Sequence, residues 1–170
     1  MTIDISEQQL RASPGDIGTT GRDIRITPGR NALVAGTVIL TLDGALPVEF
    51  IAPGDRVITR DSGVAVVQAL LRGRDVRRCV SVRAGSLGNA RPDRDVILTA
   101  TQEVLIRDWR AAALFGKTPA LVAAERLVDG AFVRDIGACD METIAVIFDA
   151  PHIVYADGLE VASAVWHTDT

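Results

Sequence analysis

Short β-branched runs separated by turn residues dominate the sequence from Leu33 onward. They recur at intervals of roughly ten residues, a spacing typical of sandwich-like or barrel-like β proteins. Turn markers such as Asp43-Gly44 and Asp129-Gly130 stand between them. The pattern predicts strands at Thr37–Thr41, Pro47–Phe50, Arg56–Thr59, Ala65–Leu71, Arg77–Arg83, Asp95–Leu98, Glu103–Arg107, Ala120–Val122, Phe132–Arg134, Glu142–Phe148 and His152–Ala156.

Two segments depart from this pattern. Asp108–Phe115 has a plausible N-cap in Asp108, a run of alanines and a stop at Gly116, which predicts one short helix. Residues 1–30 are rich in Gly, Ser, Thr, Pro, Asp and Arg and lack periodicity. They predict a flexible leader with a short strand at Ile24–Thr27, followed by a single domain over residues 31–170. The N-terminus has no apolar h-region and does not resemble a secretory signal.

The composition is that of one domain with an aliphatic core. Of the 170 residues, 48% are hydrophobic but only 4% aromatic, so Val, Leu, Ile and Ala must fill the core. The formal net charge of −4 gives no long-range attraction to nucleic acid or anionic lipid. No run approaches the roughly 18 apolar residues of a membrane span. We therefore expect neither a nucleic-acid nor a membrane partner.

The cysteines and histidines predict neither a disulfide framework nor a metal site. Cys79 and Cys139 are too few for a framework, and with His152 and His167 they form no closely spaced ligand pair. Cys79 stands in the alternating run Cys79–Val82, where we expect a small buried hydrophobe. No glycine-rich phosphate loop or Ser-His-Asp set is present, so no cofactor is expected.

An internal repeat indicates how the strands are organised. Val38–Thr41 recurs as Val96–Thr99, and Val48–Gly54 resembles Ala124–Gly130 at a larger offset, which implies an insertion in the second half. The predicted helix lies in that insertion. Two similar halves favour a pseudo-twofold β fold over a solenoid, which needs at least three units. Chance similarity between short aliphatic strands is the alternative explanation.

The stretch Gly36–Gly63 reads GTVILTLDGALPVEFIAPGDRVITRDSG. It resembles the opening of bacterial Hint-type (hedgehog/intein) domains, with Gly-Thr, a strand, an Asp-Gly turn, Pro-Val-Glu and Pro-Gly-Asp in order. Ser81–Ile106, Leu114–Gly130 and Phe148–Gly158 continue the match, which covers about Ala32 to His167. The resemblance implies an all-β, flat, horseshoe-like disc with pseudo-twofold symmetry and at most one short helix.

The same resemblance places residues at the positions where Hint domains carry out autoprocessing. That reaction begins when a Cys or Ser at the first residue attacks the preceding carbonyl, and here the position holds Ala32, which has no nucleophile. A Thr-x-x-His motif then supplies a proton to the leaving nitrogen. Here the motif keeps Thr99 but has Gln102, whose amide does not titrate near neutral pH.

Two further positions follow from a looser part of the match. It places Ala145 where many inteins have a catalytic Asp, and Ala162-Ser163 where splicing inteins end in His-Asn. Neither cysteine falls at the late position that could replace the missing nucleophile. The resemblance therefore implies a degenerate Hint domain in which Ala32, Thr99, Gln102 and Ala145 are vestigial. Natural degeneration explains these losses together more simply than engineering does.

Three functions remain open from the sequence. The first is a non-catalytic Hint module retained for binding an unknown protein or as a structural piece. The second is residual autoproteolysis, in which Asn31 cyclises and breaks the Asn31–Ala32 bond. The third is a cleft for a small polar ligand lined by Ala32, Thr99, Gln102 and His152, although His152 is more simply interpreted as an ordinary strand-edge histidine. The cytoplasm is the default location, and secreted relatives leave export without a classical signal open.

Overall fold

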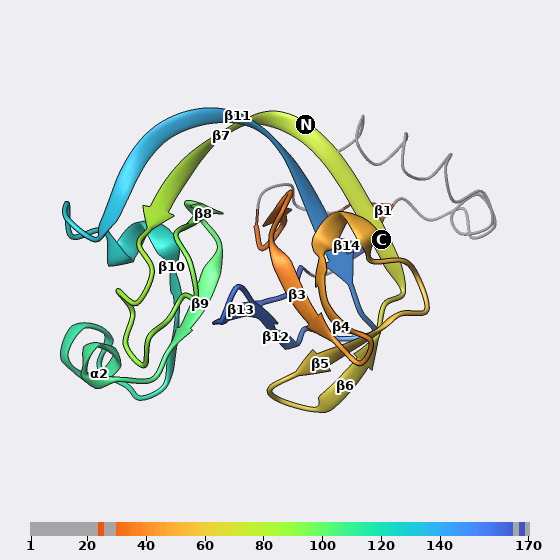
Figure 1. Ribbon diagram of the computed structural model, residues 1–170, viewed down its shortest axis with the longest axis horizontal. Helices are drawn as coiled ribbons and strands as arrows, with labels where there is room; N and C mark the ends of the chain where they lie inside the picture. The colour runs from red at the N-terminus through yellow and green to blue at the C-terminus, as the bar shows by residue number, and fades with distance from the viewer. Residues whose placement is uncertain (1–23, 26–29, 165–166, 169–170) are drawn as a thin grey trace.

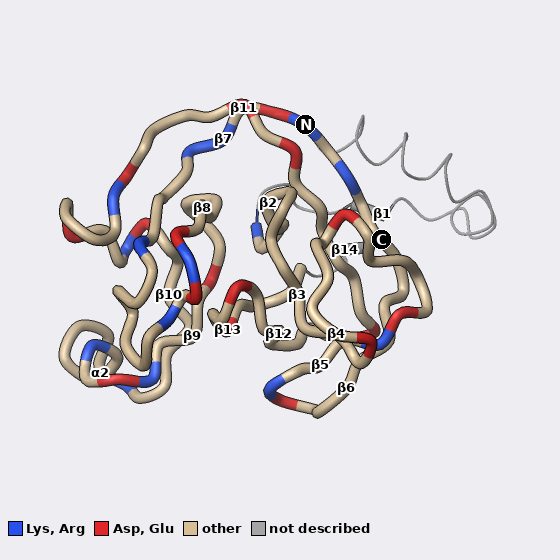
Figure 2. Tube along the Cα trace, in the orientation of Figure 1, with Lys and Arg blue, Asp and Glu red and all other residues tan. Residues whose placement is uncertain are grey.

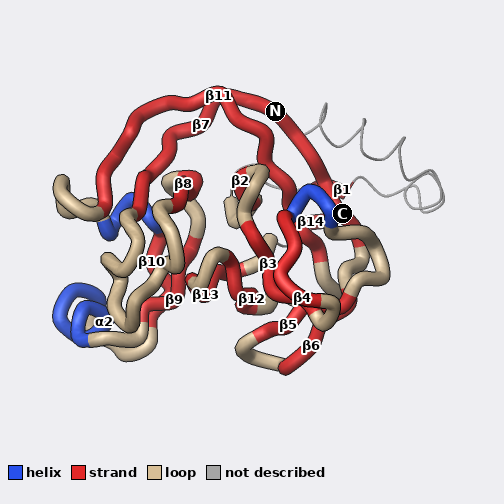
Figure 3. Tube along the Cα trace, in the orientation of Figure 1, coloured by secondary structure: helices blue, strands red, loops and turns tan. Residues whose placement is uncertain are grey.

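The computed structural model describes residues 24–25, 30–164 and 167–168. Its β-strands form three sheets (Figures 1 and 3). The strands are β1 (Ile24–Arg25), β2 (Leu33–Val34), β3 (Val38–Thr41), β4 (Gly44–Pro47), β5 (Arg56–Thr59), β6 (Gly63–Val66), β7 (Ala69–Val82), β8 (Val96–Thr99), β9 (Glu103–Ile106), β10 (Ala120–Ala123), β11 (Val133–Ile147), β12 (Ile153–Ala156), β13 (Leu159–Ala162) and β14 (His167–Thr168). Within the described residues one α-helix, α2 (Trp109–Phe115), accompanies them, and the all-β prediction is confirmed.

The longest elements form an arch over the molecule. β7 and β11 pair antiparallel along their whole length and curve from one half of the molecule to the other (Figure 1). β2 and β8 flank them in the order β2-β11-β7-β8. The sequence predicted only pieces of these strands, since Arg72–Asp75 interrupts the apolar alternation. That stretch lies on the arch, where positively and negatively charged residues follow one another along the chain (Figure 2).

The C-terminal hairpin β12–β13 joins the two halves. In the largest sheet, in the order β10-β9-β13-β12-β3-β5-β6, this hairpin lies between β9 of the second half and β3 of the first. Its turn is Asp157-Gly158, with φ of 50° and 83°, the conformation that favours Asp-Gly in tight hairpins. A Cβ added to Gly158 would lie 2.6 Å from the Asp93 carboxylate, so only glycine fits.

The predicted helix is confirmed together with both of its caps. The Asp108 side chain accepts a hydrogen bond from the Arg110 N–H at 3.0 Å, which satisfies one of the free donors at the helix start. Gly116 ends the helix with φ of 77°, and its N–H returns to the Ala112 carbonyl at 3.1 Å. Local capping chemistry was sufficient to place this element.

Several strand predictions were wrong in detail. Pro47–Phe50 is not a strand, because β4 ends at Pro47 and Val48–Phe50 forms a 3-10 helix. The predicted strand Ala65–Leu71 spans a break between β6 and β7. The short β2, β4 and β13 were not predicted as strands, while Ile24–Thr27 is confirmed only at Ile24–Arg25, because residues 26 and 27 lie outside the described part.

One of the two repeats corresponds to a structural repeat. Val48–Phe50 and Ala124–Leu127 both form 3-10 helices directly after a strand, β4 and β10, respectively. The other repeat does not, because β3 pairs with β4 in the largest sheet whereas β8 pairs with β7 in the arch. The recurrence of Val38–Thr41 as Val96–Thr99 therefore agrees with the alternative explanation, chance similarity between short aliphatic strands.

An aliphatic core fills the space between the sheets, as the composition predicted. Its fully buried members include Val48, Val57, Val80, Val161 and Ile144. Cys79 is also fully buried, as expected of a small hydrophobe. In the part of the chain that the structure describes, no helix is both long enough and apolar enough to cross a membrane.

Candidate functional site

Ala32 and Ala145 meet in one small apolar cluster. Ala32, directly before β2, is 6% exposed, and Ala145 on β11 is 5% exposed. Leu71, Ile147 and Ala164 complete the cluster around them. Two positions 113 residues apart in the sequence, which the family resemblance assigned to one active site, are therefore neighbours.

The side chain of Asn31, which precedes Ala32, is held in place by hydrogen bonds. Its Oδ1 accepts hydrogen bonds from the Gln102 Nε2 at 3.2 Å and from the Glu103 N–H at 2.9 Å. Its Nδ2 donates to the Glu103 Oε1 at 3.0 Å and to the Ser163 carbonyl at 3.4 Å. The backbone φ of 62° lies in the left-handed region, which asparagine tolerates better than most residues. The Asn31–Ala32 bond is thus held by contacts to two different segments, Gln102-Glu103 and Ser163.

Gln102 lies at the centre of these contacts with only 1% of its surface exposed. Its Nε2 donates to the Asn31 Oδ1 at 3.2 Å and to the carbonyls of Glu103 and Ala162, each at 3.0 Å. Three acceptors around one nitrogen fix the amide orientation, and the Gln102 Oε1 is buried without a partner in the described structure. Gln102 therefore ties the segment before Ala32 to β13.

Thr99 positions Gln102 through the backbone. The Thr99 carbonyl accepts the Gln102 N–H at 3.0 Å, which closes the turn between β8 and β9. Thr99 itself is 2% exposed and is paired with Cys79 of β7. Its role in the structure is to anchor this turn to the arch.

His152 contacts this site only through its backbone. The His152 N–H donates to the Ser163 Oγ at 2.9 Å, and the Ser163 N–H returns to the His152 carbonyl at the same distance. The His152 ring instead contacts Asp61, with its Nδ1 3.0 Å from the Asp61 Oδ2, and packs edge-on against Phe148. The structure thus brings Ala32, Thr99 and Gln102 close together and leaves the His152 ring outside.

Asp61 connects two segments that are far apart in the sequence. Its Oδ1 accepts the Ile153 N–H at 3.0 Å, so it joins the turn after β5 to β12. Burial alone would raise the pKa of the Asp61 carboxyl, but the hydrogen bonds from Ile153 and His152 outweigh it and lower that pKa below 3.8.

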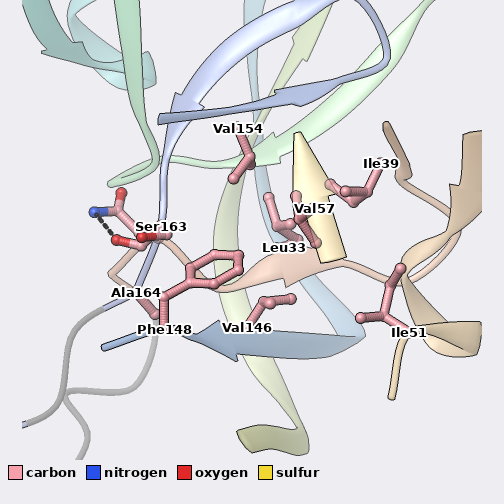
Figure 4. A pocket seen from close by; sticks show the side chains of 10 residues that line it. Leu33, Ile39, Ile51, Val57, Val146, Phe148, Val154, Ser163 and Ala164 are labelled. Atoms are coloured by element: carbon pink, nitrogen blue, oxygen red, sulfur yellow. Dashed lines mark hydrogen bonds between the residues drawn. The ribbon is translucent and has the colours of Figure 1, made fainter. Parts of the chain in front are cut away.

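The cavity next to Asn31 is small and apolar. Figure 4 shows its lining side chains, including Leu33, Val146 and Phe148, with Ser163 and Ala164 at one end. Its volume of about 10 Å³ is at the lower limit for one water molecule. Ala32, Thr99 and Gln102 are each no more than 6% exposed, and none of them lines this cavity.

Sequence reasoning missed two acidic residues near this site. Glu103 follows Gln102 and binds the Asn31 amide, as described above. Glu160 on β13 is 4% exposed and contacts Arg60, Arg91 and Arg107 at 3.3, 3.2 and 2.8 Å. All four residues of Leu159–Ala162 are buried, so the segment does not alternate, and no residue next to Glu160 in the sequence indicates three arginine partners from distant segments.

A β-arch spans two halves that the hairpin β12–β13 joins, with the chain crossing at Asn31–Ala32 between them, and this arrangement is that of an intein-like fold. The model of the Hint-domain family matches residues 31–168, and the chain belongs to that family. The expected Hint fold is confirmed. The comparison with curated protein sequences gave no significant match.

Solved structures agree on the fold. The bacterial intein-like domain from Clostridium thermocellum is 18% identical with a TM-score of 0.52, and the match covers 79% of this chain and 98% of that domain. The DnaB intein from Synechocystis sp. PCC 6803 is 12% identical with a TM-score of 0.50, covering 78% and 97%. The MchDnaB-1 intein is 14% identical, also with a TM-score of 0.50, covering 78% and 99%. At these identities the likeness extends to the fold alone.

Proposed function

We propose that this Hint domain neither cleaves nor splices its own peptide bonds and is retained as a binding or structural module. The observation that supports this most directly is the side chain at Ala32. A methyl group faces the apolar cluster of Leu71, Ala145, Ile147 and Ala164, where an acyl shift needs a thiol or hydroxyl. Positioned general acid–base catalysis typically contributes about 10²–10⁴ in rate, and Gln102 cannot supply it.

The hydrogen bonds of Gln102 give it a structural role in place of a chemical one. A neutral amide with three acceptors around its Nε2 stabilises the chain crossing without titrating. This arrangement favours rigidity at the bond that active relatives must strain and break. The domain would then serve as a stable scaffold that holds its surface loops.

Residual autoproteolysis through Asn31 is the alternative, and the geometry opposes it. Cyclisation requires the Asn31 Nδ2 to attack the Asn31 carbonyl carbon, after which the Ala32 nitrogen leaves. That Nδ2 instead donates to the Glu103 Oε1 and the Ser163 carbonyl, and both contacts must break before it can turn. A buried amide gives up such hydrogen bonds only at a cost of about 1–3 kcal/mol each.

Intact-mass measurement tests this proposal directly. We expect purified protein to keep its mass of 18.1 kDa through long incubation with thiol or hydroxylamine. A fragment that begins at Ala32 would contradict the proposal. If such a fragment forms in the wild type but not in Asn31→Gln, the cyclisation alternative is correct.

A gain-of-function experiment shows whether the absence of cleavage is due to the residues at positions 32 and 102. The double variant Ala32→Cys/Gln102→His restores a nucleophile and a titratable proton donor at the two positions. We expect thiol-dependent cleavage before residue 32 in the double variant and intact mass in both single variants, which are the matched controls. Circular dichroism checks that each variant is folded. A folded double variant that stays intact would show that these positions do not account for the inactivity.

A further inference from the structure

Three sulfur atoms meet on one face of the arch, although their spacing in the sequence gives no sign of it. The Cys79 Sγ lies 3.5 Å from the Met141 Sδ. On β11, Cys139 and Met141 are two residues apart and therefore share a face. The pairing Gly137↔Cys79, Cys139↔Arg77 and Met141↔Asp75 places Cys79 on that same face.

Gly137 explains why these side chains meet diagonally. It lies directly opposite Cys79 and has no side chain, so no β11 side chain lies directly opposite the Cys79 thiol; on the other side of β7, Cys79 is paired with Thr99 of β8. The next β11 side chains along the face are Cys139 and then Met141. Burial, together with the adjacent Cys139 thiol, raises the pKa of the Cys79 thiol to about 11. Cys79 is therefore a thiol near neutral pH until something displaces its proton.

A disulfide fits this geometry poorly. Diagonal neighbours in an antiparallel pair have Cα atoms about 7–8 Å apart, whereas a disulfide rarely spans more than about 6.8 Å. Binding a metal ion does not require so short a Cα–Cα distance, because each sulfur bonds to the ion and not to another sulfur. Three sulfurs at about 2.3 Å around a trigonal ion lie about 4 Å from one another, close to the 3.5 Å between Cys79 and Met141.

We propose that Cys79, Cys139 and Met141 form a trigonal binding site for a soft monovalent metal ion, and that this ion is Cu(I). Two thiolates and one thioether are the donor set that selects Cu(I) over harder cations. As each Cys–Cu bond forms, the thiol proton passes to solvent, and copper stays Cu(I), so no electron is transferred. The site carries a charge of −1 when loaded. On the same face the half-buried Arg77 guanidinium lies beside Cys79 and is paired with the Asp75 carboxylate at 2.7 Å.

A metal ion would reach the site from the β11 side. Cys79 is fully buried, but Cys139 and Met141 are both half-buried and line the approach to it. The three sulfur donors are not the residues on which the proposed inactivity rests, although β8 pairs Thr99 with Cys79. Loading the site therefore does not depend on whether the Hint domain is inactive.

The test is an anaerobic titration of the reduced protein with Cu(I) against a chromogenic chelator. We expect one Cu(I) per chain, binding that tightens as pH rises because thiol protons are displaced, and X-ray absorption showing three sulfur neighbours at about 2.3 Å. Met141→Leu, of similar volume, should weaken binding by at least about tenfold, and Cys139→Ser should abolish competition with the chelator.

Two outcomes would overturn the proposal. If Met141→Leu holds Cu(I) as tightly as the wild type, or the spectrum shows two sulfur neighbours, the protein has only an adventitious thiol pair. If the reduced chain oxidises to a Cys79–Cys139 disulfide faster than it loads copper, the pair is a redox cross-link. The absorption measurement uses wild-type protein, so it decides the matter even if a variant fails to fold.

Discussion

Replacement of Glu160 by glutamine should destabilise the fold more than any other single loss of a surface or buried charge considered above. The Glu160 carboxylate is 4% exposed and lies between guanidinium groups from both halves of the molecule. Arg60 follows β5 in the first half, whereas Arg91 and Arg107 belong to the second. Glu160→Gln keeps the shape of the side chain and leaves three positive charges without their counter-charge.

The size of the effect follows from the contacts. The Arg107 Nε donates to the Glu160 Oε2 at 2.8 Å, and because the Arg107 side chain is 35% exposed, this charged hydrogen bond is worth about 1.5–2 kcal/mol, the lower part of its range. Arg60 and Arg91 lie at 3.3 and 3.2 Å with side chains 35% and 31% exposed, so each can turn toward water and contributes about 0.5 kcal/mol. We expect a loss of about 3 kcal/mol, near the lower end of the range for breaking a buried ion pair.

Urea denaturation and thermal melting measure this loss. For a domain of this size, about 3 kcal/mol corresponds to a fall in Tm of roughly 6–12 °C. The matched control is Asp140→Asn, which breaks the exposed 3.3 Å pair with Arg74 and should change stability by less than about 0.5 kcal/mol. A Glu160→Gln protein as stable as the Asp140→Asn control would refute the view that Glu160 holds the two halves together.

Two further predictions concern buried and capping side chains. A double-mutant cycle with Asn31→Gly, which suits the positive φ, and Gln102→Leu should show a coupling of about 1–2 kcal/mol, and strictly additive losses would contradict a direct bond. Hydrogen bonds from the backbone N–H groups of Val133 and Ala131 lower the pKa of the Asp129 carboxyl below its ordinary value of 3.8. The ionised carboxylate should therefore stabilise the fold fully above the unfolded-state pKa, and this stabilisation should be lost as pH falls below about 4. In Asp129→Asn, the urea midpoint measured against pH should fall less steeply in this acid range than in the wild type.

Local chemistry in the sequence was enough to predict some elements and not others. The helix was predicted because Asp108 and Gly116 carry their capping signals within a few residues of it. The arch was missed because Arg72–Asp75 places charges in the middle of β7, and a ribbon exposed on a curved surface need not alternate in hydrophobicity. Pro47–Phe50 was mistaken for a strand because a β-branched, aromatic run also suits a buried 3-10 turn, and Val48 is fully buried there.

Prediction of the candidate site depended on contacts between distant segments. Family resemblance placed Ala32 and Ala145 in one site, and the structure packs them in one cluster. Nothing in the sequence indicated that the His152 ring turns toward Asp61, since that choice depends on a turn 91 residues away. Likewise Cys79 and Met141 are 62 residues apart, and only the register of β7 on β11 brings their sulfur atoms together.

Under the proposed function, the loss of the catalytic groups and the closure of the site have one physical basis. A histidine that must become charged would meet a desolvation penalty at a position only 1% exposed, whereas neutral Gln102 can be buried there because its Nε2 finds three acceptors. Methyl groups at Ala32 and Ala145 pack against Ile147, where a nucleophile and a carboxylate would need room and water. The residues at positions 32, 102 and 145 therefore favour one another. Apolar packing and hydrogen bonds at the chain crossing stabilise the fold, whereas a reactive chain crossing would hold its peptide bond under strain.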